Sequence, residues 1–201
     1  MKQLHRITGI VVAVFILLHL FNHSMAWFGV EMHQKILDTF RSVYRIPIVE
    51  IILVGCFFFQ AFSGIKLLLA LRKKKDKTTY EKIQMYTGIA LAYFIIQHIP
   101  ATIGQRILHG FDTNFYFASR VVIQKPWLYY FVPYYFMGVV VIGLHIANVH
   151  RHKISDRIGA KKANLHFYAI VSFFVLLGII ILYSLMGGRF KIVIPEIYNV
   201  Y

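Results

Sequence analysis

Hydrophobic and polar positions alternate along this chain in long blocks. Five apolar runs are each long enough to cross a bilayer as an α-helix, which takes about 20 residues. Short polar segments separate the runs, which cover Ile7–Trp27, Ile46–Leu71, Ile83–Gly104, Trp127–Val149 and Leu165–Met186. The pattern predicts an all-α integral membrane bundle of five transmembrane helices, with residues 1–201 forming a single membrane domain.

One connecting segment, Glu31–Tyr44, has a helical periodicity of its own. Its apolar residues recur at helical spacing with charged residues between them: Met32, Ile36, Leu37, Phe40 and Val43. The pattern predicts a short helix lying on the outer surface of the bundle. Such a helix acts either as a lid or spacer or as part of a functional site.

The composition agrees with a membrane protein that crosses the bilayer several times. The chain is 58% hydrophobic and 15% charged, and its mean hydropathy is +0.62. The net charge of +14 comes from basic clusters between the apolar runs, and no continuous basic face suited to nucleic acid is present. The single cysteine, Cys56, excludes an intrachain disulfide and a cysteine-ligated metal cluster within this chain.

Lysine and arginine predict the orientation. Thirteen of them lie on the side that holds the N-terminus and the loops around residues 72–82 and 151–162, and eight lie on the other side. Cytoplasmic loops carry the excess of lysine and arginine in membrane proteins. We therefore expect the N-terminus in the cytoplasm and the C-terminus outside.

Two of the apolar runs repeat one pattern that ends in histidine. Ile10 of Thr8-Gly9-Ile10 is followed nine residues later by His19, and Ile89 of Thr87-Gly88-Ile89 by His98. Ionisable residues inside a membrane are costly and are functional candidates by default. At a helix rise of about 1.5 Å per residue, both histidines belong to the outer half of the membrane, whereas His145 belongs to the inner half.

The number of ligands favours haem for the outer pair. No carboxylate or cysteine lies near His19 and His98 in the sequence, and a protein-bound zinc ion takes four ligands. Haem supplies four nitrogens from its own ring and needs two axial ligands, as in bis-histidine haem b. The alternative is a pair of structural histidines that only hydrogen-bond to neighbours. His23, one turn after His19, is a candidate contact for a haem propionate or a quinone, or a residue of the membrane interface.

The order of these features resembles the single-chain, five-helix, di-haem cytochrome b anchors of succinate dehydrogenases and fumarate reductases. The resemblance covers nearly the whole chain and rests on three motifs: Leu4-His5-Arg6, the T-G-I…His pattern of the third span, and Leu144-His145-Ile146-Ala147-Asn148. It implies a bacterial cytoplasmic membrane protein that contacts lipid and passes electrons between an iron–sulfur subunit and a quinone, with menaquinone expected. Flavoprotein and iron–sulfur partners on the cytoplasmic side would perform the dicarboxylate chemistry, with no catalytic residue in this chain.

The resemblance also assigns ligands. It makes His19 and His98 the axial ligands of a distal haem b, and His145 a ligand of a proximal one. The second proximal ligand is expected four residues before Gly64, where this chain has Gln60. One haem or two are therefore open, and Gln60 and His145 would hydrogen-bond either a quinone or each other.

Two charged residues of the second span are further candidates. Glu50 is either a proton-exchange group for quinol or an interface carboxylate, and Lys66 either extends to the lipid headgroups or neutralises a haem propionate. The alternative function is a haem-poor or haem-free anchor that only docks the soluble subunits and shapes a quinone site. A proton-coupled transporter is disfavoured because the two T-G-I spans run in the same direction, unlike inverted repeats.

Overall fold

The computed structural model describes residues 1–198, which form helices and no strand, with 85% helix overall. Five of the helices are long and apolar enough to cross a membrane, which confirms the predicted fold class. They are α1 (Lys2–Ser24, continued by the short helix η1, Met25–Phe28), α3 (Pro47–Arg72), α4 (Thr79–His109), α6 (Leu128–Ile158) and α7 (Ala160–Leu185). The side of the membrane on which each terminus lies stays a prediction from charge.

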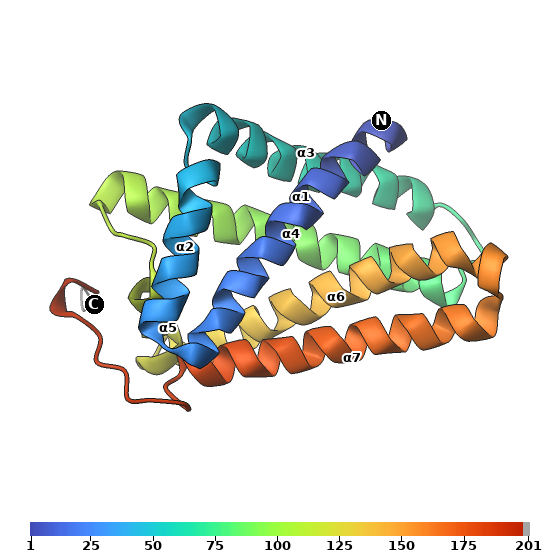
Figure 1. Cartoon of the computed structure of the whole chain (residues 1–201). Coiled ribbons are helices and arrows are strands. Elements are labelled where there is room, and N and C mark those ends of the chain that lie inside the picture. Colours follow the sequence, from blue (N-terminus) through green and yellow to red (C-terminus); the bar gives the residue numbers. More distant parts are fainter. Residues whose placement is uncertain (199–201) are drawn as a thin grey trace.

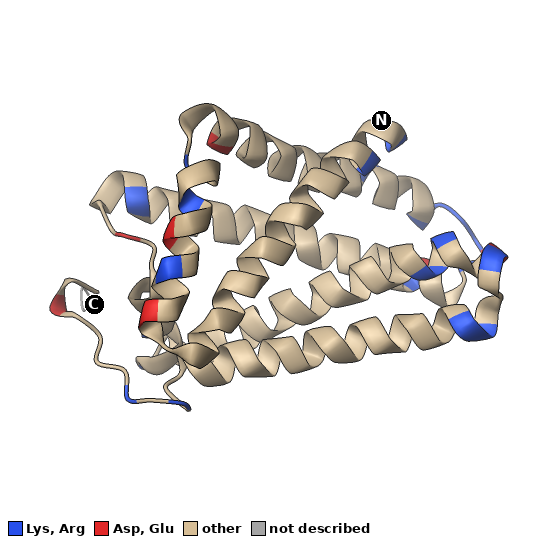
Figure 2. Cartoon of the chain, in the orientation of Figure 1, with Lys and Arg blue, Asp and Glu red and all other residues tan. Residues whose placement is uncertain are grey.

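Several helices are longer than the predicted membrane crossings. Helices α4 and α6 each have 31 residues, which makes them about 47 Å long against a hydrocarbon core of about 30 Å. Their extra turns carry charged residues at the ends of the bundle (Figure 2). The start of α4 is set by a capping box, in which Thr78 and Glu81 satisfy each other's backbone N–H groups. Hydropathy therefore locates the segment that crosses the membrane but does not locate the ends of the helix.

The bundle has two chemically different ends, which we name after the predicted orientation. At the inner end, α1 begins and short connections join α3 to α4 and α6 to α7 (Figure 1). At the outer end lie α2 (Val30–Tyr44), α5 (Phe115–Ile123) and the tail with η2 (Glu196–Tyr198). The main packing contacts are between α6 and α7, α3 and α4, α4 and α6, and α1 and α3.

Large apolar side chains cover the outside of the bundle. Examples are Ile51, Leu165 and Phe173, each more than half exposed. In water such a surface would be costly, whereas in a membrane it faces lipid tails of the same polarity. Inside the bundle, Gly143 lets α6 approach Phe174 of α7, because a Cβ at that position would overlap the Phe174 side chain.

Helix α2 confirms the helix predicted at 31–44, but of the apolar residues that predicted it only Leu37 is buried. The buried side chains are His33, Leu37 and Arg41, whereas Met32 and Val43 are exposed. The neighbouring elements explain this choice, since Arg41 forms an ion pair with Asp112 at 2.9 Å. A helix at a membrane interface can bury polar groups that find partners and leave apolar groups toward lipid.

Helix α5 was not among the predicted elements. It begins after Asn114, whose Oδ1 accepts hydrogen bonds from the backbone N–H groups of Tyr116 and Phe117. At nine residues it is too short to produce a membrane-length apolar run. It closes the outer end of the bundle, with Phe115 and Val122 fully buried.

Candidate functional site

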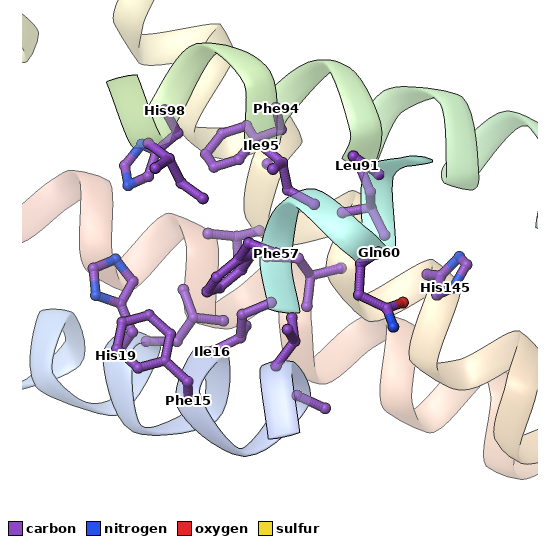
Figure 3. Close-up of a pocket in the computed structure, with 18 of the residues that line it drawn as sticks. Phe15, Ile16, His19, Phe57, Gln60, Leu91, Phe94, Ile95, His98 and His145 are labelled. Atoms are coloured by element: carbon purple, nitrogen blue, oxygen red, sulfur yellow. The ribbon is translucent and has the colours of Figure 1, made fainter. Parts of the chain in front are cut away.

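The two histidines of the repeated pattern face each other across the bundle. His19 on α1 and His98 on α4 have ring centres 6.1 Å apart, with their planes at 74° (Figure 3). Phe15 stacks on His19 and Phe94 stacks on His98, with ring centres at 5.7 and 5.0 Å. Among residues 1–198, neither imidazole has a hydrogen-bond partner, so its ring nitrogens are available to a ligand.

A cavity of about 800 Å³ runs past this pair between α1, α3, α4 and α6. Its middle is lined by apolar and aromatic side chains, including Ile16, Phe57 and Ile95 (Figure 3). This volume lies in the range of small-molecule and cofactor sites, about 300–1,000 Å³. The charged and polar lining residues gather at its two ends: Arg45, Glu50, Arg106 and Thr113 at the outer end, and His5, Arg6, Gln60, Gln84, His145 and Lys153 at the inner end.

Gln60 occupies the inner end and has its amide group fixed. Its Nε2 donates hydrogen bonds to the carbonyl oxygen of His5 at 2.6 Å and to Oγ1 of Thr8 at 2.5 Å. The Thr8 hydroxyl itself donates to the carbonyl oxygen of Leu4, so its oxygen is free to accept. Gly9 lies against the same amide, where a Cβ would sit 3.5 Å from Gln60 Oε1. Both amide protons of Gln60 are used within the protein.

The ring of His145 is also fixed by hydrogen bonds, in this case to residues of α4. The Thr87 hydroxyl donates to the carbonyl oxygen of Ile83, so its oxygen accepts from Nδ1 of His145 at 3.0 Å. This assigns the proton to Nδ1 and leaves Nε2 as the acceptor for the Gln84 amide, 3.2 Å away. Oε1 of Gln84 in turn accepts from Asn148 at 2.7 Å. Both nitrogens of His145 therefore have protein partners.

The prediction that Gln60 and His145 bond each other is wrong. Both side chains line the cavity (Figure 3), but Gln60 bonds to α1 and His145 bonds to α4. Each threonine of the repeated pattern thus holds one inner side chain, and each histidine of the pattern belongs to the outer pair. The two copies of T-G-I…His contribute to both ends of the cavity.

His23 lies inside the bundle, one residue before the outer end of α1. Its ring is 4.6 Å from that of His19, and its Nδ1 lies 3.4 Å from Nε2 of His33. His33 is 1% exposed and also contacts Asn22, with 3.2 Å between Nε2 and Nδ2. Burial, with added repulsion from His19 and Arg41, lowers the pKa of His33 to about 4.

His33 is a residue of the cavity that the sequence did not single out. It lies outside the membrane-length apolar runs, in a helix whose apolar periodicity points to other positions. The available signal was its spacing from Leu37 and Arg41, four and eight residues further on, which places the three on one helix face. That spacing identifies a buried face only once Asp112 is known to be the ion-pair partner of Arg41.

The two charged candidates on α3 have different surroundings. Glu50 lines the cavity and forms an ion pair with Arg106 at 2.7 Å, with both side chains 25% exposed. Lys66 is exposed, lies outside the cavity lining, and places its Nζ 4.4 Å from the ring centre of Phe62. The position of Lys66 agrees with an extended lysine at the lipid surface, the first of its two predicted roles.

The sequence matches no protein-family model, and no curated protein or solved structure shows a significant match. Within residues 1–198, no group of three or more histidine, cysteine, aspartate or glutamate side chains is arranged to hold a metal ion.

Proposed function

We propose that this chain binds one haem b between His19 and His98 and is the membrane anchor of a succinate:quinone oxidoreductase. The observation that carries the proposal is the pair of facing imidazoles with ring centres 6.1 Å apart in a cavity between two membrane helices, with no hydrogen-bond partner among residues 1–198. His19 on α1 and His98 on α4 would hold the haem iron, and the haem would supply the other four nitrogens from its own ring.

The chain's own residues would hold the haem and exclude water from it. Phe15 and Phe94 stack on the two ligand rings and fix their orientation. Gly138 makes room for Phe94, because a Cβ there would overlap the Phe94 ring. Haem b in such a site supplies one-electron transfer, and two protein ligands leave no open position for oxygen chemistry.

A second haem at the inner end does not fit the residues present. A glutamine amide nitrogen that donates two hydrogen bonds has no lone pair for iron, and Nε2 of His145 already accepts from Gln84. We therefore place one haem in this chain. His145 and Gln60 stay within the proposal as groups that connect α1, α3, α4 and α6 at the inner end.

The proposed anchor role rests on the resemblance to cytochrome b anchors and on the distribution of lysine and arginine. The larger number of lysines and arginines lies at the inner end, which suits docking of flavoprotein and iron–sulfur subunits on the cytoplasmic side of a bacterial membrane. Electrons would pass between the iron–sulfur subunit and a membrane quinone, menaquinone in this proposal. Glu50, which forms an ion pair with Arg106 at the outer end, would exchange protons with quinol.

The test is the amount of haem per polypeptide in the purified, assembled complex. Pyridine haemochrome analysis should give one haem b per chain, and a redox titration of the visible bands should give a single midpoint. Fully assembled complex without haem would favour the haem-free anchor instead. Two haems with two midpoints would show that the inner site binds haem despite its hydrogen bonds.

A further inference from the structure

The outer end of the cavity carries an arginine whose charge is only partly compensated. Arg45, at the end of α2, lines the cavity and donates from Nη2 to the neutral hydroxyl of Thr113 at 3.0 Å. Its nearest carboxylate, on Asp112, is 3.9 Å away and already pairs with Arg41 at 2.9 Å. The Nε of Arg45 is buried and has no hydrogen-bond partner among residues 1–198.

The residues that line this end carry two positive charges and one negative charge, and Asp38 and Asp112 beside Arg41 bring the whole cluster of ion pairs to neutrality. The charged residues that line it are Arg45, Arg106 and Glu50, and Glu50 is taken by Arg106 at 2.7 Å. Burial and the neighbouring charges of Arg41 and Arg106 lower the pKa of Arg45, with Asp112 acting in the opposite sense. A carboxylate arriving from within the cavity would find one guanidinium without a close ion-pair partner.

A chain of aromatic contacts connects the neighbour of Arg45 to the histidine pair. Tyr44, the residue before Arg45, contacts Phe15 with ring centres 5.4 Å apart, and Phe15 stacks on His19. On the opposite wall, Arg106 follows His98 by eight residues, which is about 12 Å along α4. The inner-end cation Arg6 is about 20 Å from His19 along α1. Arg106 is therefore the cation nearest to the pair along the two helices that carry the histidines, and Arg45 lines the same end of the cavity.

From these observations, and resting on the proposed haem site, we propose that Arg45 binds a haem propionate at the outer end of the cavity, with Arg106 beside it. Haem carries two carboxylates on one edge of its ring, and a guanidinium binds a carboxylate through two parallel hydrogen bonds. The macrocycle would thus be held by His19 and His98 through iron and by Arg45 through its edge. Arg45 would also raise the reduction potential of the haem, because a nearby positive charge disfavours the oxidised form.

The experiment compares the full-length protein with its Arg45→Gln, Arg45→Lys and Arg189→Gln variants. Arg189 is exposed at the outer end, outside the cavity lining, and stacks on Trp27, so its replacement removes one outer charge without touching the cavity. Each protein is freed of haem and titrated with haem b and with its dimethyl ester, in which both propionates are neutral. Midpoint potentials are measured on the haem-loaded proteins.

We expect Arg45→Gln to weaken haem binding roughly three- to tenfold and to lower the midpoint potential. Arg45→Lys should retain most of the potential, and Arg189→Gln should match the parent protein. The dimethyl ester should bind equally well to the parent and to Arg45→Gln, which also shows that the variant is folded.

Equal binding of haem b by the parent, Arg45→Gln and Arg189→Gln would overturn the inference and leave the haem site in place. Equal weakening of haem b and its ester by Arg45→Gln would also overturn it, since the loss would not depend on the propionates. A parent protein that binds neither form would instead overturn the proposed function.

Discussion

The two ends of the cavity use the same helices but different chemistry. Toward the outer end, His19 and His98 face each other, each stacked on a phenylalanine ring, and have no hydrogen-bond partner among residues 1–198. At the inner end, the polar groups of Gln60 and His145 bond to Thr8, Thr87 and Gln84. The fold supplies the hydrogen-bond partners of the inner pair and supplies none within residues 1–198 to the outer pair, which makes the outer pair the candidate binding site.

This difference separates a binding site from a structural contact between residues of similar type. A histidine in a membrane helix is a functional candidate in both cases. What distinguishes His98 from His145 is the number of ring nitrogens that the protein already occupies. The hydrogen-bond partners of a buried histidine are therefore more informative than its depth in the membrane.

The largest expected effect comes from removing one histidine at each end. His98→Ala should abolish haem binding, because one of the two proposed iron ligands is lost. His145→Ala should leave the haem content and the visible spectrum unchanged while lowering stability by about 1–3 kcal/mol, since Thr87 and Gln84 lose a partner. Haem analysis and thermal unfolding of the two purified variants measure these effects. Loss of haem in His145→Ala would remove the distinction between the two ends.

A pair of glycine substitutions on α6 separates packing near the site from packing elsewhere. A Cβ at Gly138 meets the outer edge of the Phe94 ring, whereas a Cβ at Gly143 meets the Cβ of Phe174, close to the backbone of α7. We expect Gly143→Ala to cost about 1–3 kcal/mol of stability, because Phe174 cannot rotate away.

Gly138→Ala should cost less in stability and instead change the haem spectrum or midpoint potential, because the displaced Phe94 stacks on His98. Unfolding by heat and spectroscopy of the haem bands give the two readouts. An altered spectrum in Gly143→Ala, together with an unaltered one in Gly138→Ala, would contradict the assigned role of Phe94.

The smallest expected effect is a pH dependence at the outer end. The pKa of His33 is lowered to about 4 by burial, so the unfolded segment binds more protons than the folded one between about pH 6.5 and pH 4. The stability of the docked helix α2 should therefore fall with decreasing pH over this window, by up to about 1.4 kcal/mol per pH unit. Hydrogen exchange of residues 30–44 measures it.

The matched control for this pH dependence is His109→Gln, because His109 is exposed at the same end of the bundle. This variant should retain the slope, whereas His33→Gln should reduce it. A slope that persists unchanged in His33→Gln would assign the pH dependence to another group.

The sequence by itself determined the five membrane helices and singled out His19 and His98. Both follow from short-range physics: a membrane crossing requires about 20 apolar residues, and a histidine within such a run stands out against them. It also located α2, because helical periodicity is a local property of the chain. The short helix α5 was not predicted, because its stability comes from a cap and from burial against other elements and not from a long apolar run.

Only the tertiary structure decided what each polar residue bonds to. Gln60 and His145 were expected to share a ligand or a hydrogen bond, but the threonines and Gln84 that hold them lie on helices far away in sequence. The burial of His33 and the incomplete pairing of Arg45 likewise depend on residues 11 to 68 positions distant. Hydropathy is summed along a chain, whereas hydrogen-bond satisfaction depends on which helices become neighbours. For that reason the sequence located the membrane helices and the histidines, and the fold alone separated the outer pair from the inner one.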